Sequence, residues 1–220
     1  MKRGPVFLPK KVISQEIKSV EIKVNPIDEV KIYEVYQKPD GGKLNLSNLK
    51  SCLTLGYLEK LQISTVVNAC SIIQKCKPVE QGGTYIRVPG VNYYFYEFND
   101  PPDLKCYKQA VCEILPIIDQ ELSSGKNVLV HCQAGLSRSV GIVASYLTVY
   151  SKYFLDGYSF NQHNYSEILP KAMNYLTEIK KIEPKISIIK FVQELEDFIT
   201  SLDKEMDGKS RHHEFCIRNI

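Results

Sequence analysis

The sequence predicts an α/β fold in which a central, mostly parallel, twisted sheet is flanked by helices on both faces. Short apolar runs that suit buried strands alternate along the chain with longer segments of helical periodicity. The run Val128-Leu129-Val130 suits a central parallel strand. Residues 139–150, which follow it, are apolar on nearly every side and predict a buried helix.

Length and composition indicate one globular domain with tails. The chain has 220 residues, of which 44% are hydrophobic and 24% are charged, so wholesale disorder is excluded. We expect a basic extension over residues 1–27, a folded domain over 28–203 and a polar tail over 204–220. The net charge of +3 is too small to indicate nucleic acid as a partner.

From about Ile32 onward, strands alternate with helices. Before that point, residues 20–24 alternate as an edge strand would. Residues 38–42, rich in glycine, predict a turn. The elements expected next are a helix over 49–61, a buried strand over 63–68, a β-like segment over 84–88 and an aromatic strand over 93–98.

The second half of the chain is mainly helical. An apolar stripe predicts a helix over 104–123, with Pro116 inside it and Gly125 just past its end. Residues 151–165 are polar and irregular. Amphipathic helices are expected over 167–180 and 186–202, and Pro184 opens the second of them.

The segment from Val130 to Ser139 carries the chemistry, because it joins a buried strand to a buried helix. In such a strand–loop–helix unit, backbone N–H groups and the helix N-terminus attract phosphate. Gly135 permits a tight turn, and a thiol at the position of Cys132 would ionise readily. Arg138 could hold two phosphoryl oxygens in a bidentate fork. A phosphate-binding loop with a nucleophilic thiolate is therefore expected.

The pattern His131-Cys132-x-x-Gly135-x-x-Arg138-Ser139 fits the H-C-x-x-G-x-x-R-[ST] signature of cysteine-based protein phosphatases. The fuller segment, with Ala-Ser-Tyr-Leu after it, resembles the dual-specificity branch of that superfamily. Residues 44–48 resemble the family's entry strand, with Ser47 in place of the usual glycine, and residues 184–198 resemble its closing helix. The resemblance spans about residues 32–203 and implies the cysteine-based phosphatase fold, with 28–203 as the catalytic domain.

The resemblance implies a role for each residue of the loop. Cys132 would attack phosphorus, Ser139 would aid departure of the thiolate in the second step, and His131 would order the loop by hydrogen bonds. No cofactor and no metal are implied. The residues expected to bind the phosphoryl group are Gln133, Ala134, Gly135, Leu136, Ser137 and Arg138.

The family also carries a general acid, an aspartate on a loop about thirty residues before the cysteine. Asp100 and Asp103 are both candidates. We prefer Asp100 because it directly ends the aromatic strand, as the family's acid does. Asp103 opens the next helix, where a capping role suffices.

The expected activity is hydrolysis of phosphotyrosine and phosphoserine or phosphothreonine in proteins. One alternative is a pseudophosphatase that binds phosphoproteins without turnover, but such modules typically lose the cysteine, the arginine or the acid. Another is a phosphatase for a lipid, a glucan or RNA. Lipid phosphatases favour basic residues in the loop, whereas the variable positions here are neutral. RNA relatives carry histidine and asparagine where Ala134 and Ser137 stand, and glucan relatives usually carry glycine at the latter position.

Partners and location follow from the remaining features. The partner expected is a phosphorylated protein substrate. The basic segment 1–27 resembles kinase-docking peptides, so a protein kinase is a second expected partner. The sequence shows neither a secretory leader nor a membrane span, so no membrane is expected and the cytoplasm or nucleus is the expected location. The seven cysteines fit neither a disulfide framework nor a zinc site.

Overall fold

The computed structural model of the chain describes residues 30–53, 56–70, 88–96, 104–150 and 165–183. The strands are β1 (Ile32–Gln37), β2 (Lys43–Asn48), β3 (Ile63–Asn68), β4 (Asn92–Phe95) and β5 (Asn127–Cys132). The α-helices are α1 (Leu49–Leu53), α2 (Tyr57–Lys60), α4 (Leu104–Ser123), α5 (Arg138–Tyr150) and α6 (Tyr165–Asn174). A π-helical segment, η2 (Tyr175–Ile179), continues α6.

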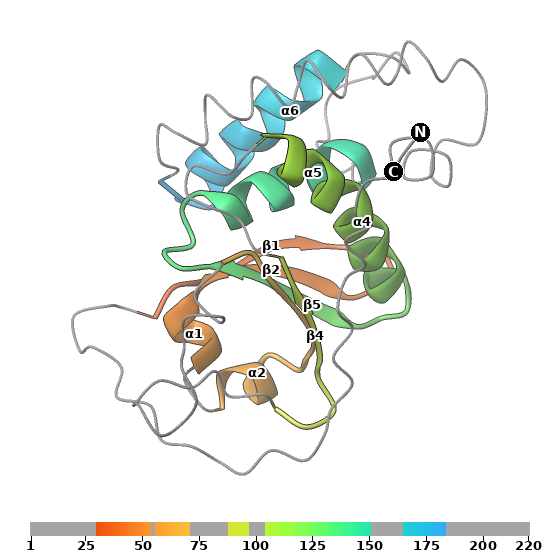
Figure 1. Ribbon diagram of the computed structural model, residues 1–220, viewed down its shortest axis with the longest axis vertical. Helices are drawn as coiled ribbons and strands as arrows, with labels where there is room; N and C mark the ends of the chain where they lie inside the picture. The colour runs from red at the N-terminus through yellow and green to blue at the C-terminus, as the bar shows by residue number, and fades with distance from the viewer. Residues whose placement is uncertain (1–29, 54–55, 71–87, 97–103, 151–164, 184–220) are drawn as a thin grey trace, which may run out of the picture.

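The strands form one sheet in the order β1-β2-β5-β3-β4. The strand β1 pairs with β2 in the antiparallel sense, and the other three pairs are parallel. Figure 1 shows α4, α5 and α6 on one face of the sheet and α1 and α2 on the other. The predicted fold class is therefore confirmed.

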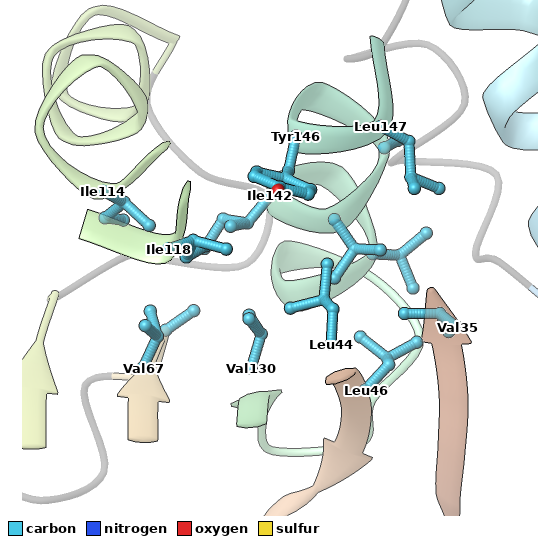
Figure 2. Close-up of a cluster of buried hydrophobic side chains, with 14 of the residues drawn as sticks. Val35, Leu44, Leu46, Val67, Ile114, Ile118, Val130, Ile142, Tyr146 and Leu147 are labelled. Carbon is cyan, nitrogen blue, oxygen red and sulfur yellow. The ribbon is translucent and has the colours of Figure 1, made fainter. Parts of the chain in front are cut away.

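The larger core lies between the sheet and the two helices α4 and α5. Apolar side chains alternate along the strands, and one set points toward these helices. In Figure 2 the labelled strand residues are Val35, Leu44, Leu46, Val67 and Val130, and the labelled helix residues are Ile114, Ile118, Ile142, Tyr146 and Leu147. A smaller cluster covers the opposite face below α1 and α2. Because α5 is buried on most sides, its first turn is held rigidly against the sheet.

The register of the parallel strands decides what surrounds the carboxyl end of β5. Asn48 at the end of β2 lies opposite Cys132, and Asn68 at the end of β3 lies opposite His131. In open parallel sheets, ligands bind at this edge, where neighbouring loops diverge. The loop that follows Cys132 therefore emerges between two neighbouring strand ends.

The structure corrects three predicted elements. The helix expected over 49–61 is two short helices, because Gly56 takes a left-handed conformation with φ 88° before α2. The aromatic strand predicted over 93–98 begins at Asn92 and ends at Phe95, and residues 97 and 98 lie outside the described residues. The helix expected over 167–180 begins at Tyr165 and changes to π-helical hydrogen bonding from Tyr175 onward.

Other predicted elements agree with the structure. The helix over Leu104–Ser123 contains Pro116 and is followed by Gly125 with φ 74°. The elements predicted at 20–24 and 186–202 lie outside the described residues, as do the segments 1–27 and 204–220. Of the β-like segment predicted over 84–88, only Val88 is described, and it is not part of a strand. In the part of the chain that the structure describes, none of the helices combines the length and the apolar character that a bilayer span needs.

Hydrogen bonds and a close backbone contact hold the start of β2 against the segment that leads into β5. The Gly42 N–H donates to the Leu122 carbonyl at 2.8 Å, and the Lys43 N–H donates to Asn127 Oδ1 at 2.9 Å. A Cβ atom on Gly42 would lie 1.9 Å from the Lys126 carbonyl oxygen. This close approach sets the β2–β5 register, which in turn places Asn48 beside Cys132.

Gly42→Ala should therefore lower the free energy of unfolding by about 3 kcal/mol, because the backbone of Lys126 cannot move aside without breaking the register. Urea denaturation measures this change. Gly90→Ala is the matched control: Gly90 has φ 82°, and a Cβ atom there would meet no other atom within 4 Å, so only backbone strain of about 1 kcal/mol is expected. An equal loss of unfolding free energy in the two variants would contradict the claim that the close approach of Gly42 to Lys126 sets the β2–β5 register.

Candidate active site

The loop between β5 and α5 forms the candidate site. Cys132 is the last residue of β5, and Arg138 is the first residue of α5. The Ser137 carbonyl accepts a hydrogen bond from the Gly141 N–H at 3.0 Å, which makes it the acceptor at the start of the helix. The first N–H groups of a helix have no acceptor within the helix, so they are available to an anion in front of it.

Donors converge on the sulfur of Cys132. The Gly135 N–H lies 3.3 Å from Sγ, and the Ser139 hydroxyl lies 3.1 Å from it. The backbone N–H groups of Ser137 and Ser139 are also hydrogen-bonded to the thiol. The sulfur thus sits in a cradle of donors that favours the thiolate over the thiol.

The pKa of Cys132 shows the balance between burial and hydrogen bonding. Burial raises the pKa of this thiol, which is only 1% exposed, but the hydrogen bonds from Ser139, Ser137 and Gly135 together outweigh burial, and the net pKa is below the ordinary value. Cys52 is nearly as buried, and burial raises its pKa in spite of a hydrogen bond with the Ser47 hydroxyl. The loop, rather than burial, therefore makes Cys132 acidic.

Gly135 allows the loop to lie against the end of β2. Its φ is 73°, and a Cβ atom there would come within 2.9 Å of the Ser47 carbonyl oxygen. Directly after β2, the Leu49 N–H donates a hydrogen bond to the Gln133 carbonyl of the loop at 3.1 Å. The loop is thus shaped by β2 as well as by its own sequence.

Two buried charged or polar side chains lie at the ends of the loop segment: His131 directly precedes Cys132, and Arg138 follows the loop. Arg138 is 5% exposed, and its backbone carbonyl accepts a hydrogen bond from the Tyr107 hydroxyl at 3.1 Å. His131 is fully buried, and burial lowers its pKa to about 4, so the ring is neutral near pH 7. Its Nδ1 lies 3.4 Å from the Cys132 carbonyl oxygen, so a proton on Nδ1 would point at the loop backbone.

The structure brings most of the predicted site residues together. His131, Cys132, Gly135, Ser137, Arg138 and Ser139 are all buried, and Gly135, Ser137 and Ser139 are hydrogen-bonded to the thiol. Gln133 and Ala134 are exposed, and Leu136 is half-buried against the core. Asp100 and Asp103 lie outside the described residues. Among the described residues, no three His, Cys, Asp or Glu side chains come together in a way that could hold a metal ion.

Sequence reasoning misses two contributors to the site. In the sequence, Tyr107 is only one member of an apolar stripe, and its hydroxyl contact with Arg138 joins residues that are 31 positions apart. Ser47 stands out only as a departure from a family pattern, whereas its carbonyl is the surface on which Gly135 packs. No local pattern signals either contact, because both depend on how α4 and β2 pack against the loop.

A buried thiol that accepts hydrogen bonds from a loop and a helix N-terminus, with an arginine at the loop's far end, defines a cysteine-based phosphatase site. The family comparison agrees with this class. The family model of the dual specificity phosphatase catalytic domain matches residues 46–198. The chain therefore belongs to this family.

Individual relatives are more distant. "Putative tyrosine phosphatase 123R" of Invertebrate iridescent virus 6 is 33% identical over 72 residues, which are 32% of this chain and 50% of the viral protein. The chain thus matches half the length of that curated relative. Two crystal structures share the fold at 18% identity, a variant of human DUSP28 and the Yvh1 phosphatase domain from Chaetomium thermophilum. The DUSP28 variant has a TM-score of 0.53, and the match covers 78% of this chain and 97% of that structure. The Yvh1 domain has a TM-score of 0.54, and the match covers 82% of this chain and 100% of that structure.

Ser139→Ala should raise the pKa of the Cys132 thiol, because it removes the nearest hydroxyl donor to the sulfur. The pH dependence of inactivation by iodoacetate measures that pKa, and its midpoint should move to higher pH. At about pH 6 the variant should be alkylated several-fold more slowly than the wild type.

Ser145→Ala is the matched control for this measurement. Ser145 is a buried serine of the same helix, and its hydroxyl donates to the Gly141 carbonyl at 2.8 Å. Its removal should leave the midpoint unchanged. An unchanged midpoint in Ser139→Ala, or an equal shift in both variants, would refute the role of the Ser139 hydroxyl.

Proposed function

We propose that this protein hydrolyses phosphotyrosine and phosphoserine or phosphothreonine in proteins through a phosphocysteine on Cys132. The observation that carries the proposal is the set of donors around a buried sulfur, which lowers the pKa of Cys132 despite its burial. A thiolate at the floor of a phosphate-binding loop is placed to attack phosphorus.

In the first step, the Cys132 thiolate forms a bond to phosphorus as the bond to the leaving oxygen breaks. Arg138 and the loop N–H groups hold the remaining three oxygens, over which the charge of the transferring group is spread in the transition state. The leaving oxygen needs a proton, and we assign Asp100 as its donor. The products of this step are the dephosphorylated side chain and a phosphocysteine.

In the second step, water attacks the phosphocysteine and gives a proton to Asp100. The sulfur–phosphorus bond breaks, and the electron pair returns to Cys132. The Ser139 hydroxyl, 3.1 Å from Sγ, would stabilise the departing thiolate. His131 would take no part as a proton carrier near pH 7, since burial lowers its pKa to about 4.

The loop's side chains support a protein substrate. Gln133 and Ala134 are its exposed side chains, and neither is charged. A lipid head group with several phosphates would favour basic side chains here, because charge-assisted hydrogen bonds are the strongest available to a phosphate. A single phosphorylated side chain needs only Arg138 and the backbone donors.

The proposal is tested by comparing substrates of matched sequence. Wild-type protein should release phosphate from a phosphotyrosine peptide and from its phosphothreonine counterpart, in the presence of EDTA as in its absence. Cys132→Ser should remove activity on both, while Cys112→Ser, a buried cysteine of α4, should retain it. Faster hydrolysis of a phosphoinositide than of either peptide would favour a lipid substrate. Binding of the peptides with no turnover by the wild type would favour a phosphoprotein-binding module.

The assignment of the general acid is tested by Asp100→Asn and Asp103→Asn. Asp100→Asn should lower kcat for a phosphopeptide by about 10²- to 10⁴-fold, because the leaving oxygen then departs without a proton. Asp103→Asn should change kcat little. Loss of most activity in Asp103→Asn, with Asp100→Asn near the wild type, would reverse the assignment.

A further inference from the structure

We propose that Tyr107 is a positioning residue for Arg138. Its hydroxyl fixes the backbone of the first residue of α5, so that the guanidinium group is oriented to form two hydrogen bonds with the phosphoryl oxygens. This inference rests on the proposed function and adds to it a residue that the loop motif does not contain. It is carried by a single buried hydrogen bond at the contact between α4 and α5.

Tyr107 lies in the first turns of α4 and is fully buried. Its hydroxyl donates to the Arg138 carbonyl at 3.1 Å. A phenol that only filled space in this core would need no hydroxyl, and burying a hydroxyl without a partner is unfavourable. The Tyr107 hydroxyl therefore has a specific acceptor, and that acceptor is the backbone carbonyl of Arg138, the residue expected to bind phosphate.

The Arg138 carbonyl can accept two hydrogen bonds, because a carbonyl oxygen has two lone pairs. As the first residue of α5, Arg138 has a carbonyl that points along the helix toward the next turn. A second donor from α4 restrains the rotation of that first turn relative to the sheet. A bidentate contact with phosphate depends on such restraint, since a planar fork tolerates little rotation.

The hydroxyl of Tyr107 stays protonated at every pH at which the enzyme would work. Burial raises its pKa well above the ordinary value, and the nearby charge of Cys132 raises it further. The donors to Sγ named above are Gly135, Ser137 and Ser139, whereas the Tyr107 hydroxyl donates to the Arg138 carbonyl, so we assign its effect to Arg138.

A second tyrosine joins the same two helices away from the loop. The Tyr146 hydroxyl of α5 donates to Asp119 Oδ1 of α4 at 3.0 Å, and Lys38 Nζ lies 2.6 Å from the same oxygen. Tyr107 and Tyr146 are thus both buried phenols that bridge α4 and α5 by one hydroxyl. Of the two, only Tyr107 reaches a residue of the phosphate-binding loop.

Tyr107→Phe deletes the bridge at the loop and keeps the ring. We expect the inhibition constant of inorganic phosphate, measured against p-nitrophenyl phosphate, to rise by about five- to tenfold, the factor that follows when alignment of the guanidinium contributes about as much to binding as one hydrogen bond. The value of kcat/KM should fall by a similar factor. The pH midpoint of iodoacetate inactivation should stay at the wild-type value, because the donors to Sγ are unchanged.

Tyr146→Phe is the control for a purely structural role. It should lower Tm at least as much as Tyr107→Phe and leave the phosphate inhibition constant unchanged. A wild-type inhibition constant in Tyr107→Phe, or an equal rise in both variants, would overturn the inference. If the wild-type protein neither binds phosphate nor hydrolyses p-nitrophenyl phosphate, the proposed function itself fails.

A double-mutant cycle separates an effect through Arg138 from an independent one. In the background Arg138→Lys, phosphate affinity can be measured by calorimetry without turnover. Tyr107→Phe should then weaken binding no further, because the fork that it aligns has been removed. An additional loss of the full five- to tenfold in that background would show that Tyr107 does not act through the guanidinium, and would refute the inference.

Discussion

The hydrogen bonds that converge on the sulfur of Cys132 are the interaction on which the rest of this site depends. Burial alone would keep the thiol neutral, as it does at Cys52. The N–H groups of the loop, the first turn of α5 and the Ser139 hydroxyl reverse that preference. Since the same groups can bind phosphoryl oxygens, one arrangement of donors would supply both the proposed nucleophile and the binding place for its target.

The fold serves to hold those donors still. The strand β5 lies in the middle of the sheet, so Cys132 emerges between two parallel neighbours. Gly135 packs against the Ser47 carbonyl at the end of β2, and α5 is buried against the sheet and α4. A rigid core on both sides of the loop lets a buried charge persist, because donors in a packed environment need little reorganisation.

Much of this could be predicted from the sequence because the site is local. Cys132, Gly135 and Arg138 fall within one short segment, and apolar periodicity places that segment between a buried strand and a buried helix. The break near Gly56 escaped prediction because the apolar pattern continues through it. The Tyr107–Arg138 contact escaped for another reason: it joins elements that meet only in the tertiary structure, and no spacing rule encodes it.

Trapping the covalent intermediate tests the role of Cys132 most directly. A phosphotyrosine peptide is mixed with excess enzyme, the reaction is quenched with acid within one turnover, and the digest is analysed by mass spectrometry. Attack by the thiolate predicts a phosphoryl group on the peptide that contains Cys132, and none in Cys132→Ser. Full release of phosphate within that turnover, with the sulfur never labelled at any quench time, would show that water attacks phosphorus directly and would contradict the central claim.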